Sequence, residues 1–255
     1  MNNSQQKIRK NWTFEETIVA LYLYFTIPFQ RVSKSNPIIQ EYGQLLNRTP
    51  SALGMKIGNI GRLDPTLRMQ NITGLSNGSK LDEEVWNTYL GKWDKLVLDF
   101  EKVIQYLQKV PDIQDEPIYT FPEGKERVTQ VSVRTNQNFF RQSVLAAYNN
   151  KCCITGIDIP ELLVASHIKP WKDDLGNRLN PRNGLCLNNL HDKAFDRGFI
   201  TFDDEFRLIL SSHLTCSKEA LQFFIPYENK VIALPDRLSP ELGFLDFHRK
   251  NIFKE

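Results

Sequence analysis

One stretch without periodicity divides the chain and limits how it can fold. Residues 110–128 are rich in proline and acidic side chains, and their apolar residues follow neither a helical nor a strand repeat. Apolar residues before this stretch recur at helical spacing, whereas those after it include short runs typical of strands. In a chain of 255 residues, this break predicts two domains, 1–109 and 129–255, joined by a linker over 110–128.

The first domain is predicted to be all-helical. Thr13 is placed to cap a first helix that Pro28 ends, and Pro37 has the position typical of the start of a second helix. Thr49-Pro50 has the residue types of an N-cap and a first helical position, which predicts a third helix after a short break. A polar loop follows, and residues 82–107 are predicted to form one long helix with Asp82 as its cap.

Two of these helices, residues 37–46 and 50–60, resemble a helix-turn-helix. The polar residues of the second helix and its ends suit contacts with phosphates and base edges, so we assign five of them to DNA binding: Arg48, Ser51, Lys56, Asn59 and Arg62. Residues 1–110 carry 14 Lys and Arg against 10 Asp and Glu, a small basic excess that favours this interpretation only weakly. The alternative is a plain helical bundle with a solvated polar face.

The composition argues against a membrane protein and favours the cytoplasm. No run of about 18 apolar residues is present, and residues 1–12 lack the apolar core of a signal peptide. The cysteines include no Cys-x-x-Cys pair, so the usual signal of a structural zinc site is absent. We expect four free, buried thiols in a reducing compartment: Cys152, Cys153, Cys186 and Cys216.

The second domain shows a strand, a loop, a second strand and a helix in succession. Residues 162–165 form an apolar strand that leads into His167, a polar loop follows over 173–181, and Asn183-Gly184 precedes a helix around His191. The spacing is 16 residues from His167 to Asn183 and 8 from Asn183 to His191. This succession is the arrangement of a ββα-metal finger, and residues 199–210 add a hairpin after it.

Four segments of this domain closely resemble the HNH endonucleases. They are Cys152-x-x-Thr155-Gly156, residues 165–171 (Ala-Ser-His-Ile-Lys-Pro-Trp), Asn183-Gly184-Leu185-x-Leu187 and His191-x-x-Ala194-Phe195-Asp196-Arg197-Gly198. The resemblance extends from about Arg134 to Leu210 and is greatest to the subgroup found in bacterial restriction enzymes, which Phe140-Arg141 also resembles. It implies an α+β chain, with an all-helical DNA-recognition domain followed by a C-terminal ββα-metal (HNH) nuclease domain.

The resemblance also implies a catalytic role for three residues. His167 would be the general base, because a neutral imidazole can take a proton from water near neutral pH. Asn183 would hold the loop and orient the base, and His191 would be a ligand of a divalent ion. That ion would be Mg²⁺, with Mn²⁺ or Ni²⁺ as alternatives, and it would neutralise charge on the phosphate and the leaving oxygen.

The second metal ligand departs from the pattern of the family. Many HNH sites have an Asp before the catalytic histidine, where this chain has Ser166. Asp196 is the candidate we assign, although it is five residues after His191 and an ideal helix would place the two on different faces. The alternatives are a cap or ion pair with Arg197 for Asp196, and a metal held by one protein ligand with phosphate and waters.

The resemblance predicts a metal-dependent endonuclease that acts on double-stranded DNA. We expect a restriction enzyme, with modified DNA as a plausible target by analogy, and a homodimer, because cutting both strands requires two active sites. Arg141, Lys169 and Arg182 are assigned to DNA binding, and Lys172 and Arg178 near the finger are further candidates for phosphate contacts. Solvated loop charges are the alternative for these cations, and a DNA-binding regulator with a decayed nuclease site is the alternative for the whole chain.

Overall fold

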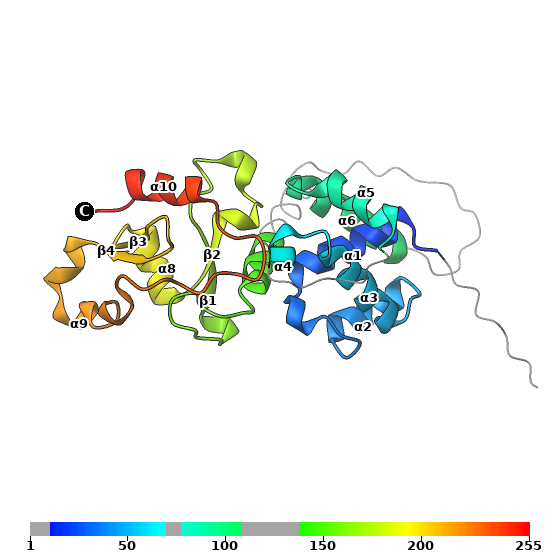
Figure 1. Cartoon of the computed structure of the whole chain (residues 1–255), viewed down its shortest axis with the longest axis horizontal. Coiled ribbons are helices and arrows are strands. Elements are labelled where there is room, and N and C mark those ends of the chain that lie inside the picture. Colours follow the sequence, from blue (N-terminus) through cyan, green and yellow to red (C-terminus); the bar gives the residue numbers. More distant parts are fainter. Residues whose placement is uncertain (1–10, 70–77, 109–137) are drawn as a thin grey trace, which may run out of the picture.

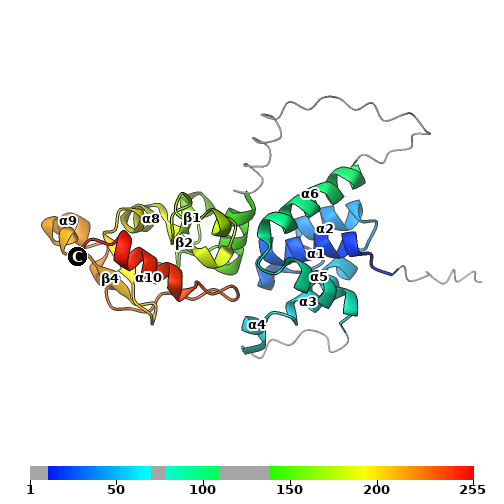
Figure 2. The same ribbon diagram turned by 90° about the horizontal axis from the view of Figure 1, so that it is seen from above.

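A computed structural model of the chain describes residues 11–69, 78–108 and 138–255. The predicted linker over 110–128 lies outside these residues. The described parts form a helical lobe, residues 11–69 and 78–108, and a mixed lobe, residues 138–255, which lie side by side in Figures 1 and 2.

Helix α1 (Phe14–Thr26) is the centre of the helical lobe, and every residue from Glu16 to Phe25 in it is buried. Its start is fixed by a capping box. The backbone N–H of Glu16 donates to Thr13 Oγ1 at 3.2 Å, and that of Thr13 donates to Glu16 Oε2 at 2.9 Å. The prediction of a first helix capped by Thr13 is therefore confirmed.

Helices α2 (Pro37–Leu45) and α3 (Pro50–Gly61) pack against each other and confirm the predicted helix pair. Asn36 and Thr49 cap them through side-chain oxygens, with proline at the first helical position in each. Between the two helices Asn47 has a φ of 51°, a left-handed conformation that asparagine tolerates. A short helix, α4 (Pro65–Met69), follows.

The prediction of one long helix over residues 82–107 is wrong. The structure has two helices instead, α5 (Lys80–Tyr89) and α6 (Trp93–Gln108). They are separated at Gly91, whose φ of 77° is a left-handed conformation that glycine adopts without strain. The cap of α5 is Ser79, and Asp82 is its partner in a capping box. The break lets α5 and α6 fold back on each other and on α1.

The mixed lobe has the predicted strand–loop–strand–helix order. Strands β1 (Leu163–His167) and β2 (Gly184–Asn188) are antiparallel, with His167 opposite Gly184 at one end and Leu163 opposite Asn188 at the other. Helix α8 (Asn189–Asp196) packs on both strands. The predicted hairpin is formed by β3 (Ile200–Phe202) and β4 (Leu208–Leu210), and a further helix, residues 138–147, precedes the finger.

Residues after Ser211 complete the core of the mixed lobe. They include two helices, α9 (Lys218–Leu221) and α10 (Leu242–Asn251). His248 of α10 is buried and stacks on Phe195 with ring centroids 3.7 Å apart. Its ring nitrogens lie 2.9 Å from Thr201 Oγ1 and 3.0 Å from the carbonyl oxygen of Phe195, so α10 is held against β3 and α8.

The two lobes meet through buried side chains. Phe139, on the helix over residues 138–147, lies against Tyr22 and Trp93, with ring centroids 5.3 and 6.2 Å apart. Arg237, a fully buried residue of the mixed lobe, donates from Nη2 to the carbonyl oxygen of Ile27 in the helical lobe at 2.6 Å. No helix in the described part of the chain is long and apolar enough to cross a membrane.

Candidate functional site

His167 is the last residue of β1 and is held in one orientation. Its Nε2 lies 3.0 Å from the carbonyl oxygen of Arg178, and its ring stacks on Phe140 with centroids 3.7 Å apart and planes 8° apart. A carbonyl oxygen can only accept, so Nε2 carries the proton and Nδ1 keeps its lone pair. Burial lowers the pKa of His167, although the carbonyl partner opposes this effect. The imidazole is therefore neutral near pH 7 and able to accept a proton.

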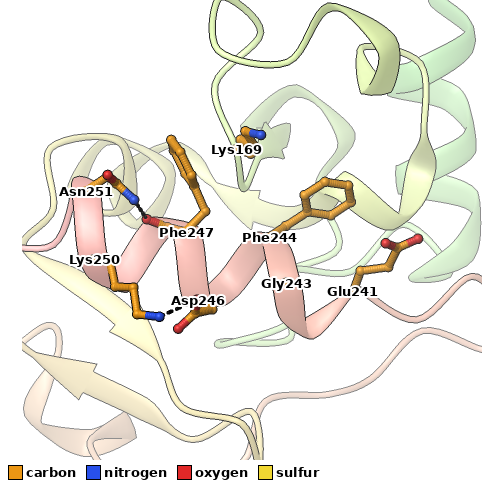
Figure 3. Close-up of a pocket in the computed structure, with 8 residues that line it drawn as sticks. All are labelled: Lys169, Glu241, Gly243, Phe244, Asp246, Phe247, Lys250 and Asn251. Carbon is orange, nitrogen blue, oxygen red and sulfur yellow. Dashed lines mark hydrogen bonds and ion pairs between the residues drawn. The ribbon is translucent and has the colours of Figure 1, made fainter.

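A cavity of about 320 Å³ beside α10 and a smaller one beside His167 differ in their linings. The cavity of about 270 Å³ at His167 also contacts Phe140, Arg141, Trp171 and Arg178. No Asp or Glu lines the His167 cavity within the residues that the structure describes, whereas the α10 cavity, shown in Figure 3, contacts Glu241 and Asp246. The surroundings of His167 therefore carry positive charge without a neighbouring carboxylate.

Asn183 fixes the chain that leaves β1. Its side chain is fully buried, its Oδ1 accepts from the backbone N–H of Lys169 at 2.8 Å, and its Nδ2 donates to the carbonyl oxygen of Lys169 at 3.0 Å. The backbone carbonyl of Asn183 accepts from Ile168 at 3.0 Å. An amide is the side chain that can both donate and accept in this way. Asn183 thus fixes the backbone two residues after His167 and helps to hold His167 in place.

His191, on α8, is buried and has one ring nitrogen available. Its Nδ1 lies 3.0 Å from Asn188 Oδ1, an acceptor, so Nδ1 carries the proton and Nε2 keeps its lone pair. Nε2 is buried and has no hydrogen-bond partner. Burial lowers the pKa of His191 to about 4, so the ring is neutral near pH 7. A neutral imidazole with a free buried nitrogen has the chemistry of a metal ligand.

The structure does not bring His191 and His167 into one cavity. His191 is tied to Asn188, which pairs with Leu163, whereas His167 pairs with Gly184 at the other end of the hairpin. The four residue steps from Leu163 to His167 span about 13 Å of strand, so the two histidines belong to opposite ends of the hairpin. His191 lines a separate cavity of about 490 Å³ that also contacts Thr155 and Tyr227. Of the three predicted catalytic residues, the structure groups His167 with Asn183 and leaves His191 apart.

No complete metal site is formed by the described residues. Helix α8 runs through Asp196, so this residue lies about 140° around the helix from His191, and its side chain is exposed. Ser166 is buried in β1, and its Oγ has no partner. Within residues 11–69, 78–108 and 138–255, no three His, Cys, Asp or Glu side chains cluster as metal ligands. Among the described residues, His191 has the free buried nitrogen of a metal ligand, and no set of three side chains completes a site.

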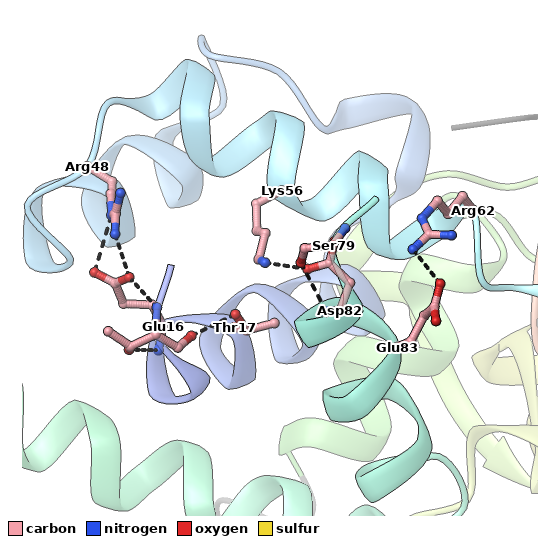
Figure 4. A network of polar contacts seen from close by, with 9 residues as sticks. Glu16, Thr17, Arg48, Lys56, Arg62, Ser79, Asp82 and Glu83 are labelled. Atoms are coloured by element: carbon pink, nitrogen blue, oxygen red, sulfur yellow. Dashed lines mark hydrogen bonds and ion pairs between the residues drawn. The ribbon is translucent and has the colours of Figure 1, made fainter. Parts of the chain in front are cut away.

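The predicted DNA contacts of the helical lobe are largely engaged in ion pairs, which Figure 4 shows. Lys56 is 3% exposed and pairs with Asp82, so its ammonium is engaged within the lobe, and its assignment to DNA binding stays a prediction. Its side chain points inward because α5 presents a buried carboxylate beside α3. Arg48 Nη2 lies 2.7 Å from Glu16 Oε2, and Arg62 Nη2 lies 3.0 Å from Glu83 Oε1.

The outer face of α3 is otherwise small and apolar. Ser51 is exposed, as a DNA contact requires, but Met55 is 58% exposed beside it. Asn59 is half-buried, and its Oδ1 is buried without a partner. The assignment of Ser51 and Asn59 to DNA binding stays a prediction, and the basic groups expected to support it are paired with carboxylates.

In the mixed lobe the predicted DNA contacts fall into two groups. Lys169 Nζ lies 3.2 Å from Asp174 Oδ2 and packs over Phe247, at the edge of the cavity in Figure 3. Arg182 Nη1 lies 3.2 Å from Glu241 Oε1. Arg141, in contrast, has only a long contact of 3.4 Å to the carbonyl oxygen of Pro160 among the described residues, and it lines the His167 cavity.

Two contacts at His167 were missed from the sequence. Phe140 stacks on the imidazole and Arg178 orients it through a backbone carbonyl. Phe140 had a signal, since Phe140-Arg141 resembles the family subgroup, but a carbonyl contact has none because any residue could provide it.

The thiols behave as expected where they are described. Cys152, Cys153 and Cys186 are free and buried, whereas the side chain of Cys216 lies outside the described part. Burial raises the pKa of Cys186 to about 12, so this thiol is protonated at neutral pH.

Comparison with known proteins supports the interpretation of the finger. No curated protein matches the chain. The model of one family, HNH_2, described as HNH endonuclease, matches residues 152–203, a range that contains His167, Asn183 and His191. This match confirms the resemblance to HNH endonucleases for the finger, and it indicates nuclease activity with DNA as the substrate.

Proposed function

We propose that the chain is a metal-dependent DNA endonuclease in which His167 is the general base. The observation that carries this proposal is the state of the imidazole, which is neutral and has Nε2–H fixed on the carbonyl of Arg178. Nδ1 would take a proton from water as the water oxygen attacks phosphorus and the bond to the leaving oxygen breaks. Asn183 supports this step by fixing the backbone two residues after His167.

A divalent ion is the cofactor that we propose, with Mg²⁺ first and Mn²⁺ or Ni²⁺ as alternatives. His191 is the residue that would hold it, because its buried Nε2 has a lone pair and no partner. Such an ion supplies neutralisation of charge on the phosphate and on the leaving oxygen. Because His191 and His167 line separate cavities, this role requires DNA binding to bring the two together.

We further propose a restriction role, with modified DNA as one possible target, and a homodimer in the cytoplasm. The restriction role rests on the resemblance of residues 134–210 to that subgroup. The dimer rests on the need for one active site on each strand. Light scattering of the protein bound to DNA would give the mass that distinguishes one copy from two.

The experiment compares cleavage of unmodified and modified DNA by the wild type and two histidine variants. Plasmid and phage DNA are incubated with Mg²⁺, Mn²⁺ or Ni²⁺, or with a chelator. Loss of a general base lowers rates by about 10²–10⁴-fold, so His167→Ala should lose cleavage to this extent. His213→Ala is the matched control, because His213 is exposed and lies outside the finger. Equal rates for His167→Ala and His213→Ala would reject His167 as the base.

A second function is favoured by one observation: no three His, Cys, Asp or Glu side chains cluster as metal ligands among the described residues. A DNA-binding regulator with a decayed nuclease site would bind DNA and cut none of these substrates with any of the three ions. Cleavage by the wild type that the chelator stops would rule out this alternative.

A further inference from the structure

The guanidinium of Arg178 has no acceptor within the described residues. It lies over the ring of Trp171, 5.2 Å from the ring centroid, and takes part in no ion pair. Its Nε is buried without a partner, and so is Trp171 Nε1 beside it. Buried donors in proteins are nearly always satisfied, so two of them in one place indicate that an acceptor is supplied from outside.

Arg141 adds a second positive charge to the same cavity. Its one hydrogen bond is the long contact to Pro160, and no carboxylate pairs with it among the described residues. Other cations of this lobe differ, since Lys169 and Arg182 both pair with carboxylates. The cavity that both Arg141 and Arg178 line is therefore set up for an anion.

The other residues that line this cavity indicate which kind of anion it would bind. Phe140 already covers one face of the His167 ring at 3.7 Å, so this face is closed to a stacking base. A guanidinium plane matches phosphate oxygens in a bidentate fashion, and two of them suit a group with two non-bridging oxygens. A phosphodiester group has this chemistry.

We propose that Arg178 and Arg141 clamp one phosphodiester group of the DNA beside His167, which deepens the proposed function and rests on it. Arg178 then acts twice. Its carbonyl accepts a hydrogen bond from His167 Nε2–H and so fixes the base, while its guanidinium binds the phosphate that the base serves. Binding of the phosphate would draw the guanidinium from the Trp171 ring and satisfy the buried donors.

Replacing the Arg178 side chain isolates the second role, because the carbonyl stays in place. The variant is Arg178→Met, and the matched control is Arg207→Met, which makes the same change of charge outside the cavity. In single-turnover cleavage of plasmid DNA, loss of one such donor should lower the rate by about 100-fold. The pH dependence of the rate should keep its shape, because the hydrogen bond that orients His167 is retained.

A binding measurement makes the test independent of cleavage. Tryptophan fluorescence is followed in chelator while thymidylyl-3′,5′-thymidine, a single phosphodiester, is added. The wild type and Arg207→Met should show a saturable change that is absent in Trp171→Phe and in Arg178→Met. This change would support the clamp even if no protein cut DNA, in which case the nuclease proposal alone would fail.

Two results would overturn the clamp. One is cleavage by Arg178→Met at the rate of Arg207→Met, and the other is an unchanged fluorescence response in Arg178→Met. If Arg178→Met does not fold, the same two measurements on Arg178→Lys test the clamp instead. A lysine keeps the charge but loses the bidentate geometry, so cleavage and binding should be reduced, and wild-type values for both would equally reject the proposal.

Discussion

Replacement of Lys56 by alanine would remove the cation from a buried ion pair between α3 and α5. The side chain of Lys56 is 3% exposed and that of its partner Asp82 is 1% exposed. Asp82 would remain in the core, where its Oδ2 still accepts from the backbone N–H of Ser79 at 3.1 Å. Its charge would then have no counter-charge from α3.

The expected cost follows from this burial. Breaking a buried pair by removal of one partner destabilises a protein by roughly 3–5 kcal/mol. In a chain of this size each kcal/mol shifts Tm by about 2–4 °C, so Lys56→Ala should melt roughly 6–20 °C below the wild type. Lys80→Ala is the control, since Lys80 is an exposed lysine at the start of α5, and its effect should stay within about 0.5 kcal/mol.

The assay combines thermal unfolding with DNA binding at several salt concentrations. A lysine that contacts a phosphate lowers the salt slope of binding by about 1 when it is removed. We expect Lys56→Ala to lower Tm and to leave this slope unchanged at a temperature where the variant is folded. An unchanged Tm together with a reduced slope would show that Lys56 contacts DNA and that the buried pair is misassigned.

Three further predictions concern buried polar groups. His191 and His248 have pKa values of about 4 in the folded chain, against about 6.5 when unfolded, so the folded state binds fewer protons. Stability should therefore fall as pH drops from about 6.5 to 4, by roughly 3 kcal/mol for each histidine, and urea unfolding of His248→Gln should show a weaker dependence. Arg237→Met should cost about 1–3 kcal/mol in urea unfolding, because the carbonyl of Ile27 loses its donor. Asn183→Asp cannot donate to the backbone after β1, so cleavage should fall although the side-chain volume is kept, and wild-type rates would refute this role.

The elements that the sequence predicts well are those set by local chemistry. Thr13 and Thr49 act as caps because their side-chain oxygens reach backbone donors within the next turn, a contact that depends on neighbouring residues alone. The strand–loop–strand–helix order is local in the same sense. The one wrong helix shows the limit, since residues 82–107 keep a helical pattern across Gly91, and only packing decides that the chain turns there.

Site geometry is harder to predict because it depends on contacts between distant residues. The spacing of His167, Asn183 and His191 indicates a finger, but the register of β1 and β2 places His167 and His191 at opposite ends of the hairpin. The orientation of His167 depends on Arg178 and Phe140, which come from two other segments. No pattern within one segment reports such an arrangement.

The sequence and the structure imply different sites for DNA binding, and the difference lies in how the charged side chains are paired. The basic excess of the first 110 residues favoured the helical lobe as the DNA-binding part. There, however, Arg48 and Lys56 each pair with a carboxylate of the same lobe that is at most 10% exposed, so breaking those pairs would offset what a phosphate contact gains. Arg141 and Arg178 have no such partner within the described residues and can bind phosphate without that cost. Electrostatic attraction to DNA should therefore depend more on the cavity at His167 than on the helix that resembles a reader.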